Sequence, residues 1–151
     1  MDGVDGHAAA LMEASLIAVA DAVAAGAPEI RFPLFDRFFE AFPERRASFY
    51  TLESSSRRMT DETVQMLYGL AAGEGWVQGL VNELSYTHRQ YGMLPQQEYD
   101  VWVDLTVDVL RDTAGAAWRA QCEAAWRVQA ERLKAMVAEA KVGWVAAMAP
   151  S

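Results

Sequence analysis

His88 is the residue of this chain best suited to bind a metal ion. It is one of two histidines, and the other, His7, lies close to the N-terminus. A neutral imidazole held by a rigid helix can bind iron through one ring nitrogen and leave the opposite coordination position open. Leu84 lies one helical turn before His88, and Gly92 and Pro95 follow it, which predicts a helix that presents His88 and ends shortly afterwards. A lone histidine on an apolar helix is more often an ordinary core or surface residue, so His88 alone predicts no function.

Other catalytic chemistry has little support in the sequence. There is no HExxH zinc motif, no phosphate-binding glycine loop and no nucleophile elbow. Two carboxylate pairs lie one helical turn apart, at Asp36 and Glu40 and at Asp104 and Asp108. Neither pair has a histidine partner, so both are typical of a solvated helix face. Cys122 is the single cysteine, which excludes an intrachain disulfide and a cysteine metal cluster.

The composition favours one soluble intracellular domain. The 151 residues suffice for a substantial core, and 52% of them are hydrophobic. The net charge of −8 argues against nucleic-acid and anionic membrane partners, because both reward clustered Lys and Arg. Asp2 and Asp5 stand where a secretion signal carries basic residues, and Glu13 and Asp21 interrupt the apolar stretch that follows. With a single cysteine as well, we expect a cytoplasmic protein without a membrane span.

Helical periodicity runs through the chain, and no strand pattern is sustained. We therefore expect an all-α fold. Pro33 predicts a kink or a late start in the second helix, and Pro43 begins a short turn that ends at Phe49. The serine-rich segment 53–58 is the best loop candidate, and Thr60 or Asp61 is expected to cap the helix after it. The expected helices cover about 7–24, 30–42, 60–73, 76–88, 99–110 and 118–144.

Two signatures, taken together, resemble the globin family. In globins a proline begins the short third helix, and six residues later a phenylalanine stacks on the haem. Pro43 and Phe49 have this spacing. The aromatic pair of the preceding globin helix matches Phe35, which would face the distal pocket, and Phe39. The leucine one turn before the iron ligand matches Leu84.

The similarity continues beyond the expected ligand. Tyr91, Gly92 and Pro95 resemble the helix-breaking corner of bacterial globins, where Tyr91 either closes the pocket or stabilises the turn. Trp126 resembles the tryptophan of their last helix. The resemblance covers the chain from about residue 34 to residue 137.

The resemblance implies a fold, a cofactor and a site. The fold is a single globin domain over residues 1–151, similar to single-domain bacterial haemoglobins, with about six to eight helices around a haem pocket. The cofactor is haem b, iron protoporphyrin IX, with His88 as the iron ligand. The residues implied to contact the haem or to line its pocket are Phe35, Phe49, Met59, Thr63, Leu84, His88, Tyr91, Met93 and Tyr99.

The distal side of the expected pocket has no histidine. Matching the usual distance back from the iron ligand places Met59 at the gate and Thr63 one turn deeper. Two shifted alignments give Glu62 and Met66, or Thr63 and Leu67. The sequence leaves these three registers open.

Hydrogen-bond donors are expected to be scarce in this pocket. Phe35 replaces the tyrosine that many bacterial globins use to bond oxygen, although Gln65, Thr63 or an arginine remain possible donors. On the other side of the haem, flavohaemoglobin-type proteins carry a Tyr–Glu pair that hydrogen-bonds the proximal histidine. The matching stretch after Trp126 offers Ala130 and, at the acidic position, Lys141. We therefore expect this pair to be missing.

The function that the resemblance implies is reversible binding of a diatomic gas, either oxygen, nitric oxide or carbon monoxide. Such a protein needs a reductase, here unidentified, and it can be a homodimer. One alternative is a haem-free globin-fold sensor or interaction module, but such modules typically lack the proximal histidine. A second alternative is a haem enzyme with peroxidase or nitric-oxide-consuming activity. The missing distal acid–base group argues against peroxidase chemistry, and no reductase domain supports a self-contained nitric oxide dioxygenase.

Overall fold

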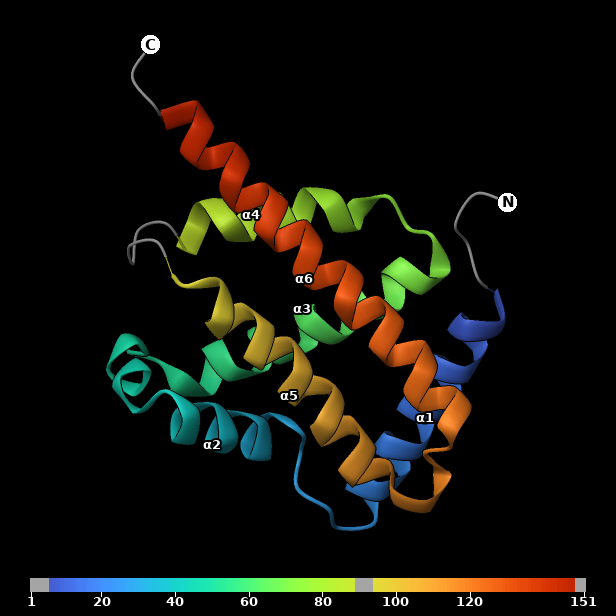
Figure 1. Cartoon of the computed structure of the whole chain (residues 1–151). Helices are drawn as coiled ribbons and strands as arrows, with labels where there is room; N and C mark the ends of the chain where they lie inside the picture. The colour runs from blue at the N-terminus through green and yellow to red at the C-terminus, as the bar shows by residue number, and fades with distance from the viewer. Residues whose placement is uncertain (1–5, 89–93, 149–151) are drawn as a thin grey trace.

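The computed structural model describes residues 6–88 and 94–148, with side chains as far as residue 142, and helices account for nearly all of these residues. No strand occurs in these two stretches, so the expected all-α class is confirmed (Figure 1). The elements are α1 (Gly6–Ala24), α2 (Arg31–Ala41), the 3-10 helix η1 (Pro43–Ser48), α3 (Leu52–Ala72), α4 (Trp76–His88), α5 (Gln96–Ala114), the 3-10 turn η2 (Gly115–Ala117) and α6 (Ala120–Met148).

The two prolines of the second and third elements occupy positions that cost no hydrogen bond. Pro33 is the third residue of α2, where backbone amides have no partner inside the helix, so α2 begins at Arg31 as the expected late start requires. Pro43 is the first residue of η1, and the short helix ends before Phe49, which confirms the expected turn.

The expected loop at 53–58 is wrong, because this segment forms the first two turns of α3. Arg31 of α2 explains the difference. Its guanidinium bonds the Glu53 carboxylate at 3.1 and 3.2 Å and the Ser56 hydroxyl at 2.9 Å. These partners occupy polar groups that otherwise favour irregular backbone. The helix therefore starts at Leu52, and neither Thr60 nor Asp61 caps it.

The corner between α3 and α4 fixes the direction in which α4 runs. Gly73 ends α3 in the left-handed conformation, with φ of 74°, and its amide bonds the carbonyls of Gly69 and Leu70. A Cβ on Gly69 would lie 2.9 Å from the Val77 side chain. This close approach brings α4 across α3 so that His88, the last residue of α4, lies beside the N-terminal half of α3.

The core lies where α6 crosses the other helices. α6 contacts α1, α3, α4 and α5, and Figure 1 shows it running diagonally across α4. Its fully buried Trp126 and Leu133 pack with Met12 of α1 and Leu110 of α5. α1 is long and apolar enough to span a membrane by length and composition, and in this fold it packs on α3, α5 and α6.

Candidate functional site

A cavity of about 330 Å³ lies at the end of the core where α3, α4, α5 and η1 meet α6. Its size falls in the range of sites for small molecules and cofactors. The wall is mostly apolar, with Phe38 and Phe49 near η1, Met59 and Met66 from α3, and Leu84 from α4. Trp102, Val103, Leu133 and Val137 complete the apolar surface from α5 and α6.

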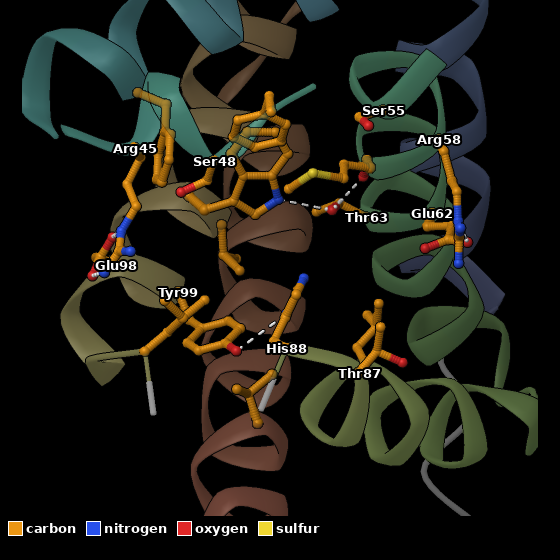
Figure 2. Close-up of a pocket in the computed structure, with 18 of the residues that line it drawn as sticks. Arg45, Ser48, Ser55, Arg58, Glu62, Thr63, Thr87, His88, Glu98 and Tyr99 are labelled. Atoms are coloured by element: carbon orange, nitrogen blue, oxygen red, sulfur yellow. Dashed lines mark hydrogen bonds and ion pairs between the residues drawn. The ribbon is translucent and has the colours of Figure 1, made fainter. Parts of the chain in front are cut away.

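His88 presents its imidazole to this cavity from the C-terminal end of α4. Its Nδ1 lies 3.1 Å from the hydroxyl of Tyr99. The other ring nitrogen points toward the space on the side of Thr63 (Figure 2). Burial lowers the pKa of His88 below its usual 6.5; the carboxylate of Glu62 opposes this shift and the guanidinium of Arg58 adds to it. The imidazole is therefore neutral at pH 7, which is the form that binds a metal.

Tyr99 supplies a neutral partner for this imidazole. Burial, with a contribution from the Glu98 carboxylate, raises the pKa of Tyr99 to about 12, while Arg45 opposes the shift. The hydroxyl is therefore protonated at pH 7. The amine of Lys141 lies 5.1 Å from the centre of the Tyr99 ring and donates a hydrogen bond of 2.6 Å to the carbonyl of Leu94.

No tyrosine partner for His88 was expected from the sequence. A tyrosine does contact His88, but it comes from α5 rather than from the stretch after Trp126. Lys141 of α6, at the position where the family resemblance places the acidic residue, lies over the Tyr99 ring as a cation. Tyr99 thus supplies a hydroxyl next to His88, and Lys141 stands where the resemblance would place a carboxylate.

Two arginines from different elements contribute to the polar part of the cavity wall. Arg45 of η1 forms a two-pronged ion pair with the nearly buried Glu98, at 2.5 and 2.8 Å. Arg58 of α3 pairs with Glu62 at 3.2 Å, and its side chain is 70% exposed. Figure 2 shows these two pairs on opposite sides of the cavity, with His88 between them. Guanidinium groups in such positions can bind the carboxylates of a bound molecule.

Among the residues that α3 contributes to the wall are Met59, Glu62, Thr63 and Met66, which follow one another at helical spacing. The first two registers considered from the sequence therefore both bring their residues to the cavity. The third does not, because Leu67 is fully buried in the core outside the lining. Gln65 is exposed and lies outside the lining as well.

A tryptophan donor faces this wall. The indole nitrogen of Trp102 donates to the Thr63 hydroxyl at 2.9 Å, and that hydroxyl donates to the Met59 carbonyl at 2.8 Å. The expectation of a donor-poor cavity therefore needs correction. The spacing of Tyr99 and Trp102, three residues apart on one helix, was the signal that could have placed both in the same wall.

The structure brings together six of the nine residues expected at the site, namely Phe49, Met59, Thr63, Leu84, His88 and Tyr99. Phe35 is buried but does not line the cavity. Its ring packs against Phe49 at 5.5 Å and Trp102 at 5.0 Å between ring centres, so these two residues separate it from the open space. Tyr91 and Met93 lie outside the described residues. Sequence reasoning missed Trp102, Arg45 and Glu98 as parts of this wall.

The donor set fits a metal held within a flat organic macrocycle. Such a metal needs one protein ligand on its proximal side, and His88 offers a neutral nitrogen. The apolar wall suits the faces of a macrocycle, and the arginines suit carboxylates at its edge. No group of three or more His, Cys, Asp or Glu that could hold a bare ion occurs in the described part of the chain.

No protein-family model matches the chain, and the curated proteins and solved structures compared with it gave no match either. The interpretation of the cavity therefore rests on the residues that line it.

Proposed function

We propose that this chain is a globin-fold protein, similar to single-domain bacterial haemoglobins, that binds haem b through His88 and reversibly binds a diatomic gas. The single observation that carries the proposal is the imidazole of His88, held by Tyr99 at the wall of an otherwise largely apolar cavity. Its position in the chain, after Pro43, Phe49 and Leu84, is the one that the family resemblance requires.

Each group of the wall has a role in this proposal. When bound, haem supplies an iron atom with a coordination position for the gas. His88 would hold that iron through Nε2, with Nδ1–H donating to the Tyr99 hydroxyl, a contact that fixes the ring orientation. Phe49, Leu84 and Met59 pack on the porphyrin faces. Arg45 and Arg58 are available for the two propionates, at the expense of part of their present ion pairs.

Trp102 lies on the α3 side of the cavity, where its indole N–H donates to the Thr63 hydroxyl. This N–H would be the donor available to a gas that binds in the cavity. Thr63 keeps the indole in place while no gas is bound. A neutral donor of this kind supports reversible binding of the gas. The proposal places the protein in the cytoplasm, where an unidentified reductase would keep the iron ferrous. The haem-free alternative is less well supported, because His88 faces the cavity.

The test is haem binding by the full chain and by two histidine variants. Apo-protein is reconstituted with hemin, and the Soret spectrum is recorded for wild type, His88→Ala and His7→Ala. We expect stoichiometric binding in wild type and His7→Ala, and loss of the wild-type spectrum in His88→Ala. Added imidazole should restore a histidine-like spectrum to His88→Ala, because it replaces the missing ligand without changing the fold. A Soret band that is the same in His88→Ala and in wild type would refute the proposal.

A further inference from the structure

Charged side chains of both signs surround the His88–Tyr99 contact, and Lys141 is the cation that lies over the Tyr99 ring. Glu98, which precedes Tyr99 in the chain, is neutralised by the two-pronged ion pair with Arg45. Lys141 of α6 lies over the face of the Tyr99 ring at 5.1 Å and is anchored on the Leu94 carbonyl. Asp100 is the remaining carboxylate near Lys141, and the side chain of Gln96 donates to it at 3.0 Å.

The partner of a ligating imidazole decides how strongly the imidazole donates electrons to a metal. A carboxylate that accepts from Nδ1–H draws the proton away and makes the ring more basic. A neutral phenol accepts more weakly, and a cation next to the phenol weakens it further, because it withdraws electron density from the hydroxyl oxygen. Weak donation favours the lower oxidation state of the metal.

We propose that Lys141, acting through Tyr99, keeps His88 a weak electron donor and thereby poises the bound iron toward the ferrous, gas-binding state. Lys141 is a positioning residue in this scheme, since it touches Tyr99 and neither the imidazole nor the iron. The inference rests on the proposed function. It adds that the charge at residue 141 selects reversible gas binding over chemistry that needs strong proximal donation, such as cleavage of an oxygen–oxygen bond.

The experiment is a charge series at residue 141 in the haem-loaded full chain. Lys141→Arg keeps the cation, Lys141→Met removes it, and Lys141→Glu reverses it. Met and Glu both lose the hydrogen bond to the Leu94 carbonyl, so a difference between them reports charge and not that contact. The midpoint potential is measured by spectroelectrochemical titration, and the iron–histidine stretching frequency of the ferrous, gas-free protein is measured by resonance Raman.

We expect the midpoint potential to be highest in wild type and Lys141→Arg, lower in Lys141→Met and lowest in Lys141→Glu. The iron–histidine stretching frequency should rise in the same order. From wild type to Glu the ferric-to-ferrous ratio at a fixed potential should rise about tenfold, which is ~59 mV for a one-electron couple. The Glu effect should shrink in a Tyr99→Phe background, because the hydroxyl that transmits it is gone.

Failures of the two proposals look different. A Soret spectrum that does not depend on His88 removes the proposed function and this inference with it. Haem bound through His88 with the same potential in the Met and Glu variants overturns the inference alone. An effect of Glu that is undiminished in the Tyr99→Phe background also overturns it, because the charge then acts without Tyr99.

Discussion

Two tryptophans, Trp126 in the core and Trp102 at the cavity, make the same chain of hydrogen bonds in different surroundings. In the core, Trp126 of α6 donates at 2.8 Å to the hydroxyl of Ser15, which donates at 2.6 Å to a carbonyl one turn earlier in α1. At the cavity, Trp102 of α5 donates at 2.9 Å to the hydroxyl of Thr63, which donates at 2.8 Å to a carbonyl one turn earlier in α3.

What differs is the space on the other side of each indole. Trp126 is fully buried, and the ring of Trp118 stacks on it at 6.2 Å between centres. Trp102 is also buried from outside, but it lines the cavity. Apart from the Ser15 hydroxyl, the core indole has only the Cys122 sulfur, a weak acceptor, within reach, whereas we expect the cavity indole to be able to exchange its partner for water or a ligand. The indole–hydroxyl bond is therefore structural in the core, and we expect the equivalent bond at the cavity to be exchangeable.

The comparison is tested most strongly by removing each hydroxyl. Ser15→Ala leaves the buried N–H of Trp126 with only the Cys122 sulfur, a weak acceptor, and we expect a loss of about 1–3 kcal/mol in the free energy of unfolding. Thr63→Val should cost less, below about 1 kcal/mol, because water in the cavity can accept from Trp102. Urea unfolding of the apo-protein measures both values.

Ser54→Ala is the matched control, since the Ser54 hydroxyl makes an exposed local bond to the Thr51 carbonyl. We expect it to change the free energy of unfolding by no more than about 0.5 kcal/mol. Equal losses for Ser15→Ala and Thr63→Val would show that the cavity indole is sealed as tightly as the core indole, and the distinction between the two regions would fail.

The second prediction concerns gas release and rests on haem binding. Trp102→Phe removes the indole donor, and we expect oxygen to dissociate about tenfold faster, which corresponds to ~1.4 kcal/mol of lost hydrogen bonding. Carbon monoxide release should change much less, because bound carbon monoxide is a weaker acceptor. Trp126→Phe, in the core, should leave both rates unchanged. Stopped-flow ligand displacement on the three proteins measures them.

An oxygen release rate that is the same in Trp102→Phe and in wild type would place the donor elsewhere. Thr63 is then the first residue to test, since its hydroxyl lines the same wall. A change of rate in Trp126→Phe of similar size would show that the assay reports general loosening of the fold.

The sequence predicted the helices well because each buries an apolar stripe at helical spacing, and it failed where a distant residue decides the backbone. Segment 53–58 carries three serines, which favour a loop locally. Arg31 lies 22 residues before Glu53 in the chain and binds the first turns of α3. No local pattern contains that partner, so the start of α3 could not be placed from sequence.

The site was predictable where spacing along one element decides what faces the cavity. Leu84 and His88 share one face of α4, and both line the wall. Phe35 could not be placed this way, since a helical stripe does not tell whether a buried ring borders a void or another ring. Trp102 shows the opposite case, because its apolar ring suits the core while its N–H faces Thr63.

The smallest expected effect is a pH dependence of the free energy of unfolding that comes from Glu123, the carboxylate bonded to Trp118. Burial opposes ionisation of Glu123, but hydrogen bonds from Arg127 and Trp118 outweigh it, so the pKa of Glu123 lies below its usual 4.5. A carboxyl with a lowered folded-state pKa stabilises the fold above 4.5 and loses this contribution as pH falls through the folded-state value. Because Glu123 is 33% exposed, we expect about 0.2–1 kcal/mol.

Glu123→Gln should therefore be less stable than wild type at pH 7, and the difference should vanish at pH values below the folded-state pKa. Unfolding curves followed by tryptophan fluorescence at several pH values measure it. His88 provides the contrast at the cavity, because burial lowers its pKa from 6.5 and the apo-protein therefore loses stability as pH falls below 6.5 toward the folded-state value. Relative to His88→Gln, wild type should lose stability at a higher pH than it does relative to Glu123→Gln. If the difference in the free energy of unfolding between wild type and Glu123→Gln does not change with pH, then Trp118 and Arg127 stabilise the Glu123 carboxylate no better than solvent does. Packing alone would then hold the core tryptophans in place.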